Sequence, residues 1–249
     1  KFRRYDVEIN FPKIYPGKRH FINESKNYAK KIWLSMGFKE MTGPAVNSGF
    51  WNFDALFVPQ DHPAREMQDT FFLKGKSTLP EKKLVDAVKK QHEDGWDYKW
   101  DSELAKKTVL RTHTTVLSAR TLAGLKESDF PVKYFSIGRN YRNEALDWSH
   151  LFEFNQSEGI VVDPKANFKQ LLGYLREFFE KMGYDKVRFR PAYFPYTEPS
   201  VEIDVYSNEK NKWLELGGAG ILRPEVVKPL LGKDIPVLAW GPGFDRIVM

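Results

Sequence analysis

The stretch with the greatest chemical potential is YRNEALDWSHLFEFNQSEG, residues 141–159. It gathers an arginine, several acidic side chains, a histidine, a glutamine and two phenylalanines in a span too short to be a domain. A guanidinium suits a phosphate bidentately, and an aromatic ring can stack on a purine base. Gln156 and Glu158 are spaced by two and could hold an ammonium group through charge-assisted hydrogen bonds. Together these groups describe a nucleotide bound beside an amino acid.

Strand parity predicts which of these side chains share a face. If 132–144 is a strand, one face carries Phe135, Ile137 and Tyr141, and the other carries Ser136, Asn140, Arg142 and Glu144. In the following strand, Phe154 lies on the same face as Gln156 and Glu158 by the same rule.

The way the two strands pair decides which polar groups meet. A hairpin that turns at roughly 147–151 would set Glu144 opposite Phe154 and Arg142 opposite Gln156. The plainer alternative is that Arg142 and Glu144 form a solvent-facing cross-strand pair. The remaining face of the second strand carries Glu153, Asn155 and Ser157, for which the pattern offers no explanation.

A second candidate anion site lies near the end of the chain. The segment GPGFDRI places Arg246 just inside a glycine-rich helix start, where free N–H groups and the helix dipole favour an anion. A tight turn beside a surface cation is the simpler reading. The chain contains neither G-x-x-x-x-G-K-[ST] nor G-x-G-x-x-G, so these two nucleotide-binding devices are excluded. It also has no H-E-x-x-H motif and no cysteine, which excludes a thiol nucleophile and Cys-ligated zinc.

The elements that must position these groups follow from periodicity. Apolar spacing predicts amphipathic helices over 25–36 and 167–182, each followed by a glycine. Strands are expected at 132–144, 151–162, 186–190, 201–206, 212–216 and 235–240. Several strands follow one another without helices between them, so the sheet should be mixed or largely antiparallel. Residues 50–73 read as ordered irregular structure, and the Lys-rich segment 74–107, with a short helical pattern near Leu84 and Val88, reads as a solvated insertion.

Composition sets outer limits on the class of protein. The 249 residues are 41% hydrophobic, which favours one large domain over several small ones. A net charge of +6 permits an anionic ligand but is far from a dense basic stripe. No long apolar run or signal peptide is evident, so we expect a soluble intracellular protein. The last helix pattern stops after about one turn at Met249, which we interpret as a fragment boundary.

Three segments resemble the signature motifs of one family. The segment MGFKEMTGP resembles motif 1 of class II aminoacyl-tRNA synthetases, FSIGRNYRNEALDWSHLFEFNQSEG resembles motif 2, and GPGFDRIVM resembles motif 3. Within this class, FWNFDALFVPQDHPAREMQDTFF, LRTHTT, FNQSEG and YFPYTEPS resemble the catalytic α-subunits of archaeal and eukaryotic phenylalanyl-tRNA synthetases. The resemblance covers nearly the whole chain. It implies an α+β class II synthetase fold, with a mixed, mostly antiparallel sheet flanked by helices, as a single catalytic domain over 1–249.

The resemblance implies a role for each member of an ATP site. Arg142 would grip the α-phosphate, Glu144 would read the adenine amino group, and Phe154 would stack on the base. His150 and Arg246 would hold the distal phosphates. Arg142 and Arg246 are therefore the expected catalytic residues.

An amino-acid site is implied in the same way. Gln156 and Glu158 would receive the ammonium group, with His113 and Thr115 nearby. The expected pocket for the substrate ring comprises Phe194, Tyr196, Ala239 and Phe72, the last at a position where other members can carry Trp. Ordinary core packing is the alternative for the two aromatics Phe194 and Tyr196.

The implied reaction is ATP-dependent activation of L-phenylalanine and its transfer to tRNA(Phe). Mg²⁺ would bridge phosphates, with Glu215 and then Glu202 as candidate ligands, although either could be a strand-surface carboxylate. The family works in the cytoplasm as an α₂β₂ assembly with a β-subunit. Alternatives are a relative that charges phosphoserine or pyrrolysine, a non-catalytic synthetase-like regulator, and a generic anion- or RNA-binding module.

Overall fold

The fold is built on one large sheet. The computed structural model describes residues 14–66, 69–143 and 151–248, together with residues 4, 6, 8 and 145. In spatial order the sheet comprises β1 (Lys39–Glu40), β5 (Val132–Tyr141), β6 (Glu153–Val162), β10 (Val237–Trp240), β9 (Lys212–Leu222), β8 (Thr197–Ser207) and β7 (Val187–Phe194). β1 runs parallel to β5, and every other neighbouring pair in this sheet is antiparallel. The expectation of a mixed, mostly antiparallel sheet is confirmed.

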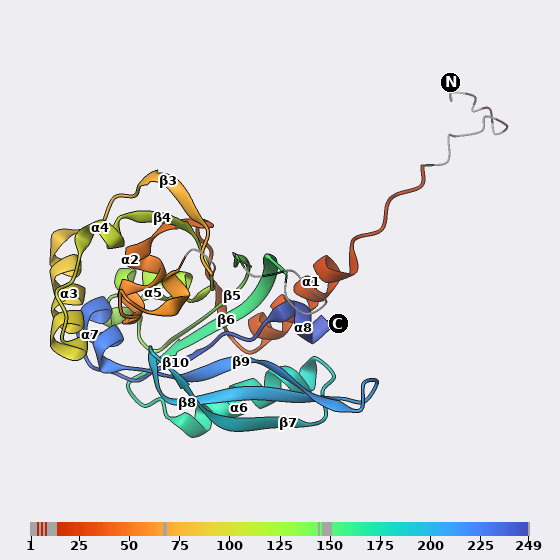
Figure 1. Ribbon diagram of the computed structural model, residues 1–249. Helices are drawn as coiled ribbons and strands as arrows, with labels where there is room; N and C mark the ends of the chain where they lie inside the picture. Colours follow the sequence, from red (N-terminus) through yellow and green to blue (C-terminus); the bar gives the residue numbers. More distant parts are fainter. Residues whose placement is uncertain are drawn as a thin grey trace.

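A smaller, three-stranded sheet lies beside one end of the large one (Figure 1). Its strands are β2 (Val46–Ser48), β4 (Lys107–Leu110) and β3 (Phe72–Lys76), in that order. The surrounding helices are α2 (Gly49–Asn52), η1 (Asp54–Leu56), η2 (Pro63–Arg65), α3 (Lys82–Trp96) and α4 (Ser102–Ala105). The helical pattern near Leu84 and Val88 is confirmed as part of α3, which packs against α7 (Pro224–Leu231). Val88 is buried in that contact region.

Both amphipathic helices predicted from the sequence are present, and they cover the large sheet. They are α1 (Phe21–Ser35) and α6 (Phe168–Lys181). α6 begins with a capping box, in which the Asn167 side chain accepts from the backbone N–H of Gln170 and the Gln170 side chain accepts from that of Asn167. The short helices α8 (Phe244–Val248) and η3 (Glu127–Asp129) complete the set together with α5 (Thr115–Gly124). No helix in the described part of the chain is long and apolar enough to cross a bilayer.

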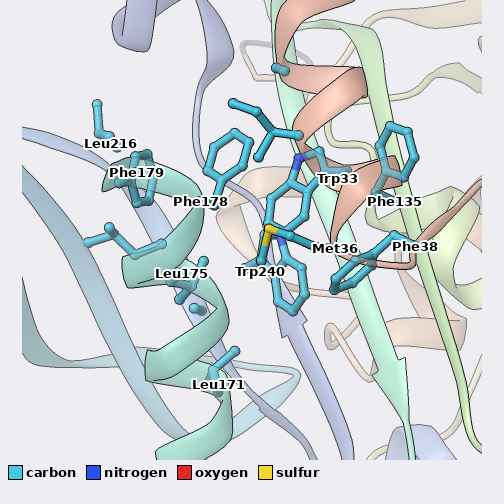
Figure 2. Close-up of a cluster of buried hydrophobic side chains, with 14 of the residues drawn as sticks. Trp33, Met36, Phe38, Phe135, Leu171, Leu175, Phe178, Phe179, Leu216 and Trp240 are labelled. Carbon is cyan, nitrogen blue, oxygen red and sulfur yellow. The ribbon is translucent and has the colours of Figure 1, made fainter. Parts of the chain in front are cut away.

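Trp33 of α1 is the centre of the main core (Figure 2). Its ring stacks on Phe178 of α6 at a centroid distance of 4.1 Å and on Trp240 of β10 at 5.2 Å. It is fully buried, and its indole N–H donates to Ser157 Oγ of β6 at 3.3 Å. Trp33 therefore joins both covering helices to the middle of the sheet.

α5 and α7 are the longest of the helices that were not expected from the sequence. α5 carries Val116, Leu117, Ser118, Ala119 and Leu122, all buried, so no polar stripe marks its helical period. α7 begins at Pro224, a position that suits proline at a helix start, but it also contains Pro229, and an interior proline normally indicates interruption of a helix. Tertiary burial outweighs local pattern in both segments.

Close packing between β6 and β10 leads to a stability prediction. A Cβ added at Gly159 would lie 2.2 Å from Cζ2 of Trp240, its register partner, at a contact held by the surrounding core. We expect Gly159→Ala to lower the free energy of unfolding by about 1–3 kcal/mol, the cost of overpacking. Urea titration followed by tryptophan fluorescence would measure it.

The matched control is Gly173→Ala in α6, where an added Cβ meets nothing within 4 Å. This change should stabilise the protein by about 0.4–1 kcal/mol through the unfolded state. Equal effects of the two substitutions would contradict the packing argument at Gly159.

Candidate active site

A cavity opens on the large sheet between β6, β8, β9 and β10. Its lining comprises Thr115, Gln156, Glu158, Phe194, Tyr196, Thr197, Gly218, Ala219, Ala239, Trp240 and Gly241. Six residues singled out from the sequence for an amino-acid site are brought together in it, namely Thr115, Gln156, Glu158, Phe194, Tyr196 and Ala239. The cavity has a polar end and an aromatic end, so it suits a ligand that is charged at one end and apolar at the other.

Glu158 forms the polar end and is almost completely buried. Its carboxylate accepts from Ser118 Oγ at 2.7 Å, from Thr115 Oγ1 at 3.1 Å and from Gln156 Nε2 at 3.3 Å. Burial raises the pKa of Glu158 to about 8, because desolvation disfavours the charged form more than the two hydroxyl donors favour it. A cationic ligand would supply a countercharge, which none of the described residues provides to this carboxyl.

Gln156 is held in one orientation by its neighbours. Its Oε1 accepts from Asn140 Nδ2 at 2.7 Å and from the backbone N–H of Thr114 at 3.3 Å, so its amide nitrogen is turned toward Glu158. A Cβ at Gly241 would lie 2.2 Å from that nitrogen. The glycine therefore lets the backbone approach the Gln156 amide closely.

Two polar side chains that bond directly to Gln156 or Glu158 were missed as site residues by the sequence analysis, Ser118 and Asn140. Ser118 lies one helical turn after Thr115, and the i, i+3 spacing would have indicated it had α5 been predicted. Asn140 is fully buried and pairs in register with Phe154. Its position on the Arg142 face was predicted by parity, but no signal distinguished it as a partner of Gln156.

Aromatic rings form the other end of the cavity. The rings of Phe194 and Tyr196 lie 6.2 Å apart between centroids, with an interplanar angle of 28°. A Cβ at Gly218 would lie 2.4 Å from the Phe194 ring, so glycine is required for this ring to lie flat against β9. Burial raises the pKa of the Tyr196 phenol to about 12, with a contribution from Glu158. The phenol is therefore neutral across the physiological range.

His113 lies next to the cavity but outside its lining. Its ring centroid is 6.4 Å from that of Tyr196. Burial lowers the pKa of His113 to about 3, and the positive charge of Arg142 lowers it further. The imidazole is neutral, and among the described residues its Nδ1 has no hydrogen-bond partner. It can accept a hydrogen bond from a ligand but carries no charge at neutral pH.

Arg142 and Phe154 meet beside the polar end of the cavity. The guanidinium carbon of Arg142 lies 5.0 Å from the centroid of the Phe154 ring, and its Nε donates to the Thr112 carbonyl at 3.2 Å. Arg246 of α8 donates from Nη1 to the Glu215 carbonyl at 3.3 Å. Each guanidinium thus donates to a backbone carbonyl. Glu144 and His150 lie outside the described residues.

The predicted register of the motif-bearing hairpin is wrong. Tyr141 pairs with Glu153 and Asn140 with Phe154, so Arg142 is not opposite Gln156 but bonds through its backbone N–H to the Phe152 carbonyl. The pairing is displaced by four residues from the predicted one. The strands end at 141 and 153, so the connection is longer than the tight turn that was assumed. Because the displacement is even, the facial assignment of Gln156 and Glu158 is unaffected.

Phe72 is not brought into the cavity. It lies on β3, pairs with Val109 of β4, and has Lys107 Nζ 5.3 Å from its ring centroid. It is absent from the cavity lining. The resemblance to the family placed it with the pocket, but the small sheet holds it elsewhere.

Glu202 and Glu215 converge on one cation, the guanidinium of Arg190. Their carboxylate oxygens lie 2.8 Å and 3.7 Å from Arg190 Nη2. Within the described ranges, no group of three or more His, Cys, Asp or Glu side chains could hold a metal ion. Mg²⁺ is commonly held by one or two carboxylates together with substrate phosphates, and these two glutamates fit that mode rather than a closed protein cage.

Comparison with known proteins points to one family. The profile described as tRNA synthetases class II core domain (F) matches residues 4–249. The phenylalanine–tRNA ligase alpha subunit of Methanopyrus kandleri is 53% identical over 259 residues, covering 100% of this chain and 49% of that protein. The corresponding subunit of Methanocaldococcus jannaschii is 53% identical over 251 residues, covering 99% of this chain and 52% of that protein. The chain thus spans about half the length of these curated relatives.

A solved structure supports the same fold. The crystal structure of pyrrolysyl-tRNA synthetase from Desulfitobacterium hafniense aligns with a TM-score of 0.63 and 19% sequence identity. The alignment covers 92% of this chain and 68% of that one. At this identity the match concerns the fold alone.

Proposed function

The chain belongs to the family of class II tRNA synthetase core domains, and on this premise we propose that it activates L-phenylalanine with ATP and serves its transfer to tRNA(Phe). The observation that carries the proposal is the two-ended cavity. Its buried Glu158 and oriented Gln156 suit an ammonium group, and its Phe194 and Tyr196 rings suit an aromatic side chain. The names of relatives with 53% identity support the same assignment.

In the proposed reaction the phenylalanine carboxylate attacks the α-phosphorus of ATP and pyrophosphate leaves. Arg142 neutralises charge on the α-phosphate, and Phe154 offers adenine the face of its ring that the Arg142 guanidinium does not cover. Arg246 holds the distal phosphates, with Glu144 and His150 as further ATP ligands. Gln156, Glu158 and Thr115 hold the substrate amine, and His113 accepts a hydrogen bond nearby. No side chain acts as a nucleophile, so the protein works by positioning and by charge neutralisation.

Bound Mg²⁺ would neutralise phosphate charge, and Glu215 and Glu202 are the residues that would hold it. For this, Arg190 must yield part of its contact with them, which its two hydrogen bonds to Asp204 make feasible. We further propose that residues 1–249 form one catalytic domain with an insertion at 74–107, that it works in the cytoplasm, and that a β-subunit completes an α₂β₂ assembly. The relatives are named as alpha subunits, which supports the proposal of a partner subunit.

Phosphoserine, one of the competing substrates, fits the cavity less well. A phosphoserine side chain would need a cation at the inner end, whereas the described residues that line the cavity include no Lys or Arg. Phe194 and Tyr196 leave an aromatic surface in its place.

The test is amino-acid-dependent ATP–pyrophosphate exchange by the full-length protein with its partner subunit. We expect exchange with phenylalanine and much less with tyrosine, phosphoserine or pyrrolysine. Faster exchange with any of these three competitors would overturn the substrate assignment. Absence of exchange with all four would overturn the proposed activity.

The size of the aromatic end can be tested at Ala239, which lines the cavity and is nearly fully buried. We expect Ala239→Gly to admit p-chlorophenylalanine, because an added heavy atom must find volume in a close-packed pocket. The measurement is the ratio of kcat/KM for p-chlorophenylalanine to that for phenylalanine. A ratio equal to that of the wild type would show that Ala239 does not abut the ring.

A further inference from the structure

The face of β6 that turns away from the cavity connects the strand to two helices. Glu153 pairs with Arg139 of β5 at 3.0 Å. Ser157 accepts from the Trp33 indole, and Asn155 contacts both α1 and α8. These three residues were the ones that strand parity left unexplained. Their partners show that this face is an attachment surface for neighbouring elements.

Asn155 forms a two-point contact with Asp245, the residue immediately before Arg246. The backbone N–H of Asn155 donates to Asp245 Oδ2 at 2.7 Å, and its side-chain Nδ2 donates to Asp245 Oδ1 at 2.9 Å. The Asn155 Oδ1 accepts from Lys26 Nζ of α1 at 3.1 Å. Every polar atom of the Asn155 side chain is therefore engaged, and its orientation is fixed by its two partners.

This contact determines how α8 is turned about its axis. Phe244 and Ile247 point into the core and are 0% and 5% exposed. Apolar contacts tolerate a small rotation of a short helix, but hydrogen bonds to a carboxylate are strict in distance and angle. The Asp245 contact therefore sets the direction in which the adjacent Arg246 leaves the helix toward β9. α1 and α8 lie side by side at this end of the sheet (Figure 1).

We propose that Asn155 is a positioning residue that aims Arg246 at the distal phosphates of ATP by clamping Asp245. The inference rests on the proposed function, which assigns Arg246 to ATP. Asn155 touches no substrate in this scheme, since it lies on the opposite face of β6 from Gln156 and Glu158. It acts through Asp245 and the helix backbone.

Asn155→Asp tests the clamp with a nearly isosteric change. It sets a second carboxylate 2.9 Å from that of Asp245 and removes the side-chain donor. We expect the KM for ATP to rise about tenfold, the factor for losing one hydrogen bond to a charged group, while the Kd for phenylalanine stays within about twofold. The measurements are ATP–pyrophosphate exchange and calorimetric binding on the full-length protein with its partner subunit.

The double variant Asn155→Asp/Asp245→Asn is the matched rescue. It exchanges donor and acceptor, so Asn at 245 can donate to Asp at 155 and still accept from the backbone N–H. Lys26 then faces a carboxylate instead of an amide. We expect the KM for ATP to return to within about threefold of the wild type, a residual that corresponds to imperfect hydrogen-bond geometry.

Three results would overturn the proposal: an unchanged KM for ATP in Asn155→Asp, equal losses for ATP and phenylalanine, or no rescue in the double variant. Equal losses would indicate general destabilisation instead of positioning. Direct calorimetric binding of ATP separates this inference from the proposed function. If phenylalanine supports no exchange but the variants still weaken and restore ATP binding as expected, the clamp stands and the substrate assignment falls. If the wild type binds no ATP, both fall.

Discussion

Arg142→Ala is expected to lower the rate of phenylalanine-dependent ATP–pyrophosphate exchange by roughly 10²–10³-fold, the scale for removing one preorganised charge contact in a transition state. The guanidinium lies over the Phe154 ring and is tied through Nε to the Thr112 carbonyl. This arrangement fixes the charge before substrate arrives. Because the interaction is proposed to strengthen as charge develops on the α-phosphate, kcat should fall more than KM for ATP rises.

The matched control is Arg139→Ala, which lies on β5 three residues before Arg142. Arg139 is exposed and pairs with Glu153 on the face away from the cavity. Its loss should leave exchange within about twofold of the wild type, because an exposed ion pair contributes little. Unchanged exchange in Arg142→Ala, or an equal loss in both variants, would remove Arg142 from the reaction.

Glu158→Gln is expected to raise the KM for phenylalanine by roughly 10²-fold, the scale for truncating one partner of a buried charge pair. The wild-type carboxyl has a pKa of about 8 because it is buried, so it is mostly protonated in the unliganded protein at pH 7. An ammonium ligand favours the ionised form, and its binding at pH 7 should therefore release about one proton. Calorimetry in two buffers of different ionisation enthalpy measures that proton directly.

The pH dependence has a definite sign. Raising the pH from 6 to 8 ionises Glu158 in advance, so the KM for phenylalanine of the wild type should fall over this interval. In Glu158→Gln the KM should be flat, since Gln does not titrate. Glu153→Gln, on the opposite face of the same strand, is the control and should behave as the wild type does. A pH-dependent KM in Glu158→Gln would assign the titration to another group.

Although substrate binding should become tighter as the pH rises, the folded protein without ligand should become less stable. With its pKa raised from 4.5 to about 8 in the folded state, Glu158 binds more protons folded than unfolded between these two pH values. The free energy of unfolding therefore decreases as pH rises through that interval. Glu158→Gln removes this decrease, so the unliganded variant should be at least as resistant to heat at pH 8 as the wild type. If Glu158→Gln is stably folded but binds phenylalanine weakly, the loss of binding is not caused by a loss of folding.

Periodicity predicted the helices that have one solvent-exposed and one buried face. α1 and α6 have such faces, and so their helical spacing was visible in the sequence. α5 is buried on almost every side, so it lacks the alternation of polar and apolar positions from which a helix can be predicted. Ser118 was missed for the same reason.

Parity was reliable where register was not. The alternation of side chains along β6 follows from strand geometry alone and correctly grouped Gln156 with Glu158. Register depends on where the connection turns, and the true pairing of Asn140 with Phe154 could not be read from residue types. The assignment of roles to Arg142, Arg246 and the pocket aromatics came from resemblance to a family, not from spacing. Phe72 shows the limit of such transfer, because it lies on β3 and outside the cavity lining.

The cavity owes its shape to backbone as much as to side chains. A Cβ would lie 2.4 Å from the Phe194 ring at Gly218 and 2.2 Å from the Gln156 amide at Gly241. Every missense change in a glycine codon adds at least one carbon atom. In a saturation mutagenesis experiment, these two positions should therefore tolerate fewer replacements than the aromatic residue that they accommodate, Phe194, where other flat or apolar side chains remain available. The strictest positions of the site would then be those whose side chain is a hydrogen atom.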